Sequence, residues 1–520
     1  MRELHMQNEN SQSALFLKPK RTTQWILVVI LLLGGFAVRL FDFDDLPLDF
    51  AATRQLHSLL MARGFYYSMD TPQTNALDPA IRKIGIEAGK DQPAIEPPVM
   101  EHLAAYTYAF LWKEWPNAGR FYSILFWVIG GIPLFLLTRK LISVNGALAS
   151  MAFYLFVPFG TYASRSFQPD PLMIMSILWA LYFQYNWYKQ SSTKNAIMAG
   201  IFTGLAFYIK ALAVFFVGFP IVVFVIMKGF KNWIKDWRVY MMAFIALFPA
   251  VLYNVLSITV GHNEGSILGS RFFPSLFIDP SWYHHWFTMA KSIVGYFPLF
   301  LALLAIFLIR QKEFRILYLI LWIGYVLFGF TVAYHIYTHN YYSLPLVFIC
   351  AIGFGVVTDV IFQKLEEINL RKFARVLIVG LMTAAILLTA LVTRNNLKLD
   401  SYRHEAAYWK VLGEKIGTNK TVIALSHDYG YRLQYWGFVL PKTWPTRGDM
   451  AVSELAGATS PEFAEYFKSA TDGMEYFLIT LIGDFEAQKD LHDYLFANYP
   501  YEQGDGYYLF DLRHPLGKVN

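Results

Sequence analysis

The sequence predicts an α-helical polytopic membrane protein with about eleven transmembrane helices and a small α/β domain at its C-terminal end. Three observations predict this class: eleven long apolar runs, basic residues concentrated in every second gap between them, and a more mixed composition after residue 397. Hydrophobic residues make up 56% of the 520 residues and charged residues only 16%. An ordinary soluble domain is about 25% charged, so this composition is typical of an integral membrane protein.

The apolar runs approach the ~20 residues that an α-helix needs to cross the hydrocarbon core, and the shorter runs can use interfacial flanking residues. They lie at residues 25–40, 121–137, 147–162, 172–187, 196–209, 212–227, 241–256, 293–308, 317–332, 344–362 and 376–392. The first run lacks a small-residue cleavage site. We therefore expect it to be retained as a span that also targets the chain to the membrane.

Lysine and arginine residues fix the expected topology because they lie in alternate gaps. These gaps hold Lys18, Lys20 and Arg21; Arg139 and Lys140; Lys189 and Lys194; Lys228, Lys231, Lys235 and Arg238; Arg310, Lys312 and Arg315; Lys364, Arg371, Lys372 and Arg375. By the positive-inside rule they face the cytoplasm, which places the N-terminus inside and, after an odd number of spans, the C-terminal segment outside. We therefore expect a multi-pass protein of the plasma or inner membrane with external segments at 42–120, 261–291 and 398–520.

Charge and cysteine content exclude other classes. The net charge of +6 is explained mostly by the cytoplasmic gaps, and no basic stretch with interleaved aromatic residues predicts nucleic-acid binding. The single cysteine, Cys350, lies inside a predicted span, which excludes an intrachain disulfide and a cysteine metal cluster.

The predicted organisation is a membrane module, residues 1–397, whose first external loop covers 42–120, followed by an extracytoplasmic soluble domain, residues 398–520. In this tail, strand-like and helical stretches alternate, which predicts an α/β or α+β domain. The strands are expected at 421–425, 476–481 and 506–512, and the helices at 405–416 and 460–467.

The first external loop contains a candidate base. Asp49 stands where an N-cap belongs, ahead of a helix expected to end at Gly64. Leu56, Leu59 and Arg63 share one face of that helix, which is typical of an element lying on the membrane surface. Asp49 is therefore either a helix cap or a general base at the membrane boundary.

Three further external segments carry polar residues. Glu96 and Glu101 lie on either side of Pro97–Pro98, which prevents helix before it and permits helix after it. Arg165 and Asp170 lie in a short segment between two spans and can pair as a surface bridge of little energetic value. The third segment, residues 334–345, holds two histidines and four tyrosines, although interfacial tyrosines are also ordinary members of aromatic belts.

Lys210 lies between two apolar runs on the expected outer side. A lone ammonium there is costly unless it reaches water or meets an anion. Each motif has a simple structural explanation by itself, so the functional signal is that unrelated loops bring acids, cations and histidines to one face.

Four of these segments resemble the bacterial branch of the dolichyl-phosphate-mannose protein mannosyltransferase superfamily, glycosyltransferases of the GT-C fold that are family 39- or 83-like. The segments are 47–55, 96–98, 164–170 and 338–345, and the resemblance covers about residues 25–395 and, more loosely, the tail. The chain departs from the family pattern where Ala51–Ala52 replace an expected His-Pro and where Asn340 replaces an expected acidic residue. Contacts of that histidine or acid with acceptor or metal are therefore not carried over.

The resemblance implies a polyprenyl-phosphate-sugar donor and inverting transfer of its sugar to a hydroxyl on the extracytoplasmic face. The acceptor would be a glycolipid, a protein or a cell-wall glycan. In this reading Asp49 is the catalytic base, and the acceptor-side or metal-binding acids are Glu96, Glu101 and Asp170. The donor phosphate would be bound by Arg54, Arg165 and Lys210, and the site would be closed by His339 and Tyr342. A divalent cation with oxygen ligands is compatible with this acidic set, but no ligand spacing requires one.

Two alternatives remain open. A transporter or lipid flippase would perform no covalent chemistry, but such proteins place ionisable residues near the bilayer midplane and are often built from repeats, neither of which the sequence shows. An oligosaccharide polymerase or ligase would use a similar donor and differ in product size. The sequence does not name the sugar, the acceptor, the metal dependence, the oligomeric state or the role of the tail.

Overall fold

The computed structural model describes residues 15–17, 21–93, 95–259, 272–398, 401–458 and 462–517. Lys18 and Lys20 of the first basic gap and residues 261–271 of the second expected external loop lie outside the described residues. The chain divides into two compact units. Unit 1 comprises Met1–Phe43, Ala94–Pro97 and Arg120–Leu399; unit 2 comprises Asp44–Pro93, Pro98–Gly119 and Asp400–Asn520. The break between Leu399 and Asp400 lies close to the expected boundary after residue 397, and most of residues 42–120 is grouped with the tail.

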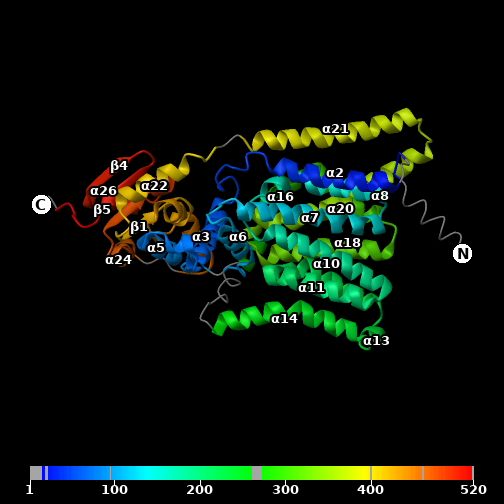
Figure 1. The fold of residues 1–520 in the computed structure, drawn as a ribbon, viewed down its shortest axis with the longest axis horizontal. Helices are drawn as coiled ribbons and strands as arrows, with labels where there is room; N and C mark the ends of the chain where they lie inside the picture. Colours follow the sequence, from blue (N-terminus) through cyan, green and yellow to red (C-terminus); the bar gives the residue numbers. More distant parts are fainter. Residues whose placement is uncertain are drawn as a thin grey trace. The chain divides into compact units, whose positions relative to one another are not determined.

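Unit 1 is a helical bundle (Figure 1). Its main helices are α2 (Arg21–Arg39), α7 (Ala118–Leu141), α8 (Val144–Phe156), α9 (Pro158–Ala163), α10 (Asp170–Gln190), α11 (Thr193–Ile209), α12 (Val214–Met227), α14 (Trp237–Thr259), α16 (Pro280–Val294), α17 (Tyr296–Leu308), α18 (Lys312–Thr331), α20 (Leu344–Glu367) and α21 (Lys372–Asn396). Short turns of helix accompany them: η1 (Ala211–Ala213), α13 (Phe230–Trp233), η2 (Pro274–Ile278), α19 (His335–Thr338) and η3 (Asn340–Ser343). All eleven apolar runs of the sequence are thus helical.

Six helices among the described residues are long and apolar enough to cross a membrane, or seven if the bent pair α16 and α17 counts as one span. The pair is bent by 99°, and α8 and the segment from Ala211 to Met227 are shorter apolar helices. Short helices of this kind fall below the ~20 residues of a full span. The number of eleven spans therefore stays a prediction, whereas the helical polytopic class is confirmed.

Helix α20 lies at the centre of the bundle, whereas α21 lies at its edge. In the most apolar stretch of α20, 83% of the residues are buried, whereas only 6% are buried in the corresponding stretch of α21. A Cβ added at Gly355 of α20 would clash with the carbonyl oxygen of Gly146 in α8, so the two backbones pack in direct contact. Small residues permit such close helix packing in membranes.

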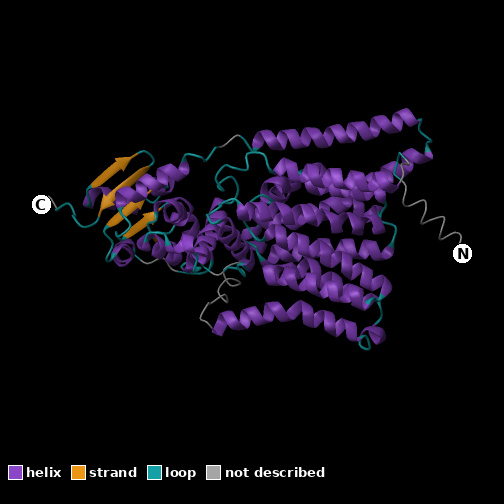
Figure 2. Ribbon diagram, in the orientation of Figure 1, coloured by secondary structure: helices purple, strands orange, loops and turns teal. Residues whose placement is uncertain are grey.

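Unit 2 combines the loop helices α3 (Ala52–Ser68), α4 (Pro72–Asn75), α5 (Pro79–Lys90) and α6 (Val99–Leu111) with the tail. The tail contains α22 (Glu405–Ile416), β1 (Val422–Leu425), η4 (His427–Gly430), η5 (Leu433–Gly437), β2 (Lys442–Thr443), α23 (Arg447–Leu455), α24 (Phe463–Thr471), β3 (Tyr476–Ile479), α25 (Ile482–Ala487), α26 (Lys489–Asn498), β4 (Tyr501–Gly504) and β5 (Tyr507–Asp511). The strands form one sheet in the order β2-β1-β3-β5-β4, drawn in orange in Figure 2.

The sheet is mixed, because β1 is parallel to β2 and β3, whereas β5 is antiparallel to β3 and β4. Two apolar clusters pack on it. One includes Phe467, Phe477 and Phe510, and the other includes Trp409 and Leu478. Successive side chains of a strand alternate between faces, so Phe477 and Leu478 of β3 fall in different clusters. The expected α/β tail is confirmed, with α22 at the predicted bounds and the three predicted strands within about two residues of theirs.

Two expectations for the first external loop are wrong. Helix α3 continues past Gly64 to Ser68, since Gly64 packs its bare backbone against Gly89 of α5 instead of ending the helix. The helix is also not a membrane-surface element with one exposed face. Leu56 and Leu59 are fully buried within unit 2, and Arg63 is only 6% exposed.

Candidate functional site

Lys210 lies at a break between two helices of unit 1. It follows Ile209, the last residue of α11, and adopts an extended backbone conformation before η1 begins. Its side chain is 9% exposed, and Nζ lies 2.8 Å from Asp170 Oδ1 and 3.0 Å from Oδ2. The buried ammonium has therefore met an anion, as its position between two apolar runs required.

Two carboxylates surround this ammonium. Asp170 is the first residue of α10 and is 2% exposed, and a negative charge at a helix N-terminus is favourable because of the helix dipole. Glu96 Oε1 lies 3.5 Å from Lys210 Nζ, at 12% exposure. The group of three side chains carries two negative charges and one positive charge, so it is acidic as a whole.

Aromatic residues lie around Lys210. Its Nζ lies 5.8 Å from the ring centroid of Tyr341 and 5.4 Å from that of Tyr342, within the range of a cation–π contact. The Tyr342 ring lies 5.2 Å from the His335 ring and 6.2 Å from the His339 ring. The structure therefore brings Lys210, Asp170, Glu96, Tyr342 and His339 of the predicted site together.

Arg165 is not part of a surface bridge, so the expected pairing with Asp170 is wrong. It is 1% exposed, and its guanidinium donates to the carbonyl oxygens of Phe41 at 2.6 Å and Asp42 at 3.0 Å. Asp170 pairs with Lys210 instead. Arg165 thus holds the backbone where the chain leaves α2, at a point where Asp42 has a left-handed backbone conformation with φ of 51°.

Arg39 was missed by the sequence reading. This last residue of α2 is fully buried, and its Nε donates to Ser164 Oγ at 2.6 Å. Its Nη1 donates to the carbonyl oxygens of Gly35 at 2.6 Å and Leu155 at 2.9 Å. The sequence signal for Arg39 was an arginine at the end of an apolar run, where a charged side chain needs polar partners.

Asp49 belongs to unit 2 and does not cap α3, so that reading is wrong. The N-cap of α3 is Ala51, in a left-handed conformation with φ of 47° and no side-chain cap bond. Asp49 is exposed, and Gln55 Nε2 lies 3.3 Å from its Oδ1. A left-handed alanine costs about 1–2 kcal/mol, and such strain is often found in functional loops. The candidate base therefore sits in a turn whose shape is held by its surroundings.

The other predicted residues of unit 2 contact its interior. Glu101 accepts a hydrogen bond from Ser58 Oγ at 2.6 Å and is 6% exposed. Arg54 lies close enough to Tyr431 of the tail to act on the pKa of that phenol, which burial raises and Arg54 partly lowers. Next to Arg54, Thr53 Oγ1 donates to Asp428 Oδ1 at 2.6 Å. The first turn of α3 is thus bonded to the tail.

A buried ionic cluster in unit 2 was also missed. The Arg63 guanidinium donates to Glu114 from Nε at 3.0 Å and from Nη2 at 2.9 Å, and its carbon lies 3.6 Å from the Tyr435 ring centroid. Burial by itself raises the pKa of Glu114, but Arg63 together with hydrogen bonds from Tyr67 and Tyr435 leaves that pKa below its ordinary value. The available signal was a single arginine on the leucine face of α3.

Within the described residues, no group of three or more histidine, cysteine, aspartate or glutamate side chains is arranged to hold a metal ion. Glu96 and Asp170 provide oxygen ligands of the kind a hard cation prefers. In this structure their partner is the Lys210 ammonium.

Part of the chain matches one family model. Residues 95–254 match the family model described as dolichyl-phosphate-mannose-protein mannosyltransferase. No curated protein sequence matches the chain.

Solved structures match almost the whole chain. ArnT from Cupriavidus metallidurans, in the apo state and bound to undecaprenyl phosphate, aligns with a TM-score of 0.57 and 13% identity over 94% of this chain and 98% of ArnT. The archaeal oligosaccharyltransferase AglB from Archaeoglobus fulgidus, in complex with an inhibitory peptide and a dolichol-phosphate, aligns with a TM-score of 0.57 and 12% identity over 94% of this chain and 74% of AglB. The GT-C fold is confirmed, and the chain is a multi-pass membrane protein.

Proposed function

We propose that this protein is a membrane glycosyltransferase that moves a sugar from a polyprenyl-phosphate donor to an acceptor hydroxyl on the extracytoplasmic face, with inversion. The observation that carries the proposal is Lys210, a buried ammonium held between Asp170 and Glu96, inside the segment that matches the mannosyltransferase family model. The ArnT structure with undecaprenyl phosphate and the AglB structure with dolichol-phosphate support a polyprenyl-phosphate ligand for this fold.

The chemistry of the proposed reaction requires a cation at the leaving phosphate, because an alkyl phosphate leaves poorly unless its developing charge is stabilised. Lys210 is the candidate within unit 1. The Lys210 ammonium has three N–H donors. Both carboxylate oxygens of Asp170 accept hydrogen bonds from it. Glu96, at 3.5 Å, is the more distant carboxylate. We propose that the donor phosphate takes the place of Glu96 at Lys210, so donor binding directs Glu96 toward the acceptor or a divalent cation.

A carboxylate must also deprotonate the acceptor hydroxyl and aim it at the anomeric carbon. Asp49 is the proposed base, since it is exposed and stands in a strained turn. In this proposal Arg54 and Arg165 assist at the phosphate, and Arg165 also fixes the backbone of residues 41 and 42. Glu101 and Asp170 support the acceptor side, His339 and Tyr342 close the site, and the tail helps to select the acceptor.

A transporter or flippase without covalent chemistry is the second candidate. Transporters place ionisable groups at the bilayer midplane on interrupted helices. In this chain the ionisable side chains of the candidate site lie at helix ends, because Lys210 follows the last residue of α11 and Asp170 begins α10. That placement favours chemistry at the membrane boundary.

The test is sugar transfer from radiolabelled polyprenyl-phosphate sugars by the purified protein in detergent. The wild type is compared with Asp49→Asn and with Asp91→Asn, a matched control at an exposed residue following α5. Consumption of one donor by the wild type and the control, but not by Asp49→Asn, is the expected result. If no donor is consumed while lipid binding or movement persists, the flippase replaces this proposal.

A further inference from the structure

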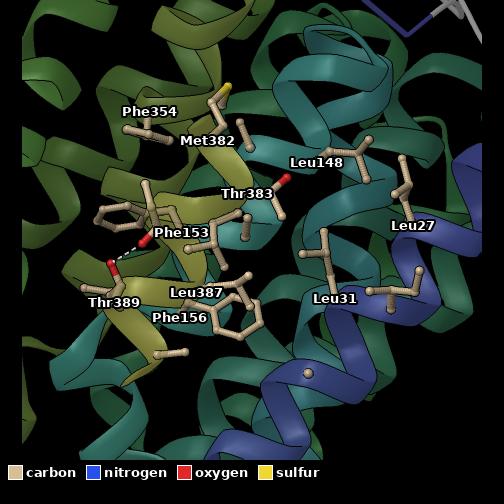
Figure 3. A pocket seen from close by; sticks show the side chains of 18 of the residues that line it. Leu27, Leu31, Leu148, Phe153, Phe156, Phe354, Met382, Thr383, Leu387 and Thr389 are labelled. Carbon is tan, nitrogen blue, oxygen red and sulfur yellow. Dashed lines mark hydrogen bonds between the residues drawn. The ribbon is translucent and has the colours of Figure 1, made fainter. Parts of the chain in front are cut away.

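An apolar groove of about 800 Å³ lies between α21 and the face formed by α2 and α8 (Figure 3). Leu27 and Leu31 of α2, Phe153 and Phe156 of α8, and Met382 and Leu387 of α21 line it. In Figure 3 side chains from the three helices point toward a common space. Among the described residues, the groove therefore has apolar walls without an apolar filling.

Helix α21 leaves the groove open because it packs loosely. Thr393 is the only buried residue of α21 in the part of the chain that the structure describes. Lining residues of this helix run from Val379 to Arg394, which corresponds to about 22 Å at 1.5 Å per residue. The groove thus extends over most of a hydrocarbon core of ~30 Å. Its length suits extended lipid chains rather than a small solute.

The charge of the groove is confined to one end. The hydroxyls of Thr383 and Thr389 donate hydrogen bonds to carbonyl oxygens one turn earlier in α21, at 2.9 Å each. Asn145 accepts a hydrogen bond from the Phe16 amide at 2.7 Å. Arg394 is the one charged residue among those described along the groove.

Arg394 lies at the end of the groove that is also lined by Phe41, and its guanidinium lies 4.9 Å from the Phe41 ring centroid. Its Nε is buried, and no hydrogen-bond acceptor reaches it from the described residues. A buried N–H donor without a partner is costly, and a guanidinium binds phosphate with strong charge-assisted hydrogen bonds. The groove therefore suits a molecule with long apolar chains and a phosphate at one end.

This groove is separate from the Lys210 site. Helix α21 contacts α2, α8 and α9, whereas α11, which ends just before Lys210, contacts α10 and α14. Figure 1 shows α21 and α14 along opposite edges of the bundle. A donor lipid whose phosphate reaches Lys210 is therefore not the natural occupant of the groove.

We propose that the groove binds a glycerophospholipid of the surrounding bilayer, with its acyl chains along α2, α8 and α21 and its phosphate at Arg394. Bilayer phospholipid is the amphiphile present in excess around these helices. Its chains fill the apolar space, and its phosphate supplies the acceptors for Arg394. Bound in this way, the lipid joins α21 to the rest of the bundle.

The test measures phospholipid binding to the full-length protein. The purified protein is delipidated in detergent, titrated with dioleoylphosphatidylglycerol and examined by native mass spectrometry. Two variants address the groove: Arg394→Gln removes the phosphate partner, and Ala390→Phe fills the lined space. Their matched controls are Lys372→Gln, an exposed charge at the other end of α21, and Ala384→Phe, an exposed position outside the lining.

The expected result is one retained phospholipid in the wild type and both controls, with affinity at least about tenfold weaker in Arg394→Gln and Ala390→Phe. Equal binding by all five proteins would overturn the proposal, because it would mean that the lipid is held non-specifically. Competition with undecaprenyl phosphate separates the two lipid classes. Displacement of the phospholipid from the groove by equimolar undecaprenyl phosphate would also overturn it and make the groove a donor site. Neither result depends on sugar transfer.

Discussion

Lys210 Nζ lies 2.8 Å from Oδ1 and 3.0 Å from Oδ2 of Asp170, which ties the break after α11 to the first residue of α10. Forty residues of sequence separate the two side chains, and each is almost fully buried. The pair is therefore structural and, in the proposed reaction, the part of the site that receives the phosphate.

Replacement of Lys210 by methionine is expected to abolish sugar transfer and to destabilise the bundle. Removing one partner leaves Asp170 as an uncompensated buried charge, which typically costs about 3–5 kcal/mol. The double variant Lys210→Met with Asp170→Asn should recover much of the stability but none of the transfer. Thermal unfolding in detergent and donor turnover measure the two effects. A single variant that melts like the wild type and still transfers sugar would contradict the assignment.

Asp49→Asn is expected to lower kcat by about 10²- to 10⁴-fold, the usual contribution of general-base catalysis. The Tm should stay within about 1 °C of the wild type, because Asp49 is exposed and surface substitutions change stability little. Initial rates at saturating donor and a thermal melt check this prediction. A variant that loses activity and also melts earlier would indicate a structural role for Asp49.

Thr53→Val is expected to slow transfer without changing donor affinity. The substitution removes the 2.6 Å hydrogen bond to Asp428, which joins the first turn of α3 to a tail segment where Asp428 and Tyr429 both have positive φ. Loss of one such bond costs about 0.5–1.5 kcal/mol, and the turn that presents Asp49 should become less well positioned. Steady-state kinetics should show a lower kcat with an unchanged KM for donor. Thr53→Ser, which keeps the hydroxyl, serves as the control.

The Arg63–Glu114 pair is expected to stabilise unit 2 in a pH-dependent manner. The folded pKa of Glu114 lies below its ordinary value, so its stabilising contribution is fully present above the pKa of the unfolded chain, about 4.3. The contribution is lost as the pH falls through the lower folded pKa. Urea unfolding from pH 7 to pH 3 should therefore show a smaller loss of stability in Glu114→Gln than in the wild type. Parallel curves for both proteins would contradict this linkage.

At neutral pH, Arg63→Met should cost more than Arg63→Lys, because lysine keeps the charge that Glu114 needs. A double-mutant cycle with Glu114→Gln measures the coupling between the two side chains.

Arg63 also donates a hydrogen bond to the Tyr435 carbonyl oxygen. Deletion of the tail after Leu397 is therefore expected to destabilise α3 as well as to remove the tail.

The sequence predicted the helices of the bundle well because long apolar runs admit few alternatives to a helix in a membrane. The tail was also predictable, since Glu405–Ile416 and the runs around β1, β3 and β5 carry their own periodicity. The loop helix was predicted less well. Gly64 is a helix-ending signal in isolation, but its close contact with Gly89 gives it a packing role that no local pattern records.

Part of the candidate site was predictable from the sequence and part was not. Lys210 was predictable because an ammonium between two apolar runs is costly unless an anion lies next to it. Its partners were not, since Glu96 and Asp170 are distant in sequence and Asp170 had a nearer cation in Arg165. Asp170 pairs with Lys210 and not with Arg165, because the Arg165 guanidinium donates to the carbonyl oxygens of Phe41 and Asp42.

By itself the sequence determined the helical membrane class, the α/β tail and most of the residues of the candidate site, because these follow from local hydrophobicity, charge and spacing. The tertiary structure was needed to show which side chains pair, that most of residues 42–120 forms a compact unit with the tail, and that α21 leaves an apolar groove ending at Arg394. The physical reason is that pairing and packing free energies depend on distances between residues far apart in the chain. Local patterns carry no information on those distances.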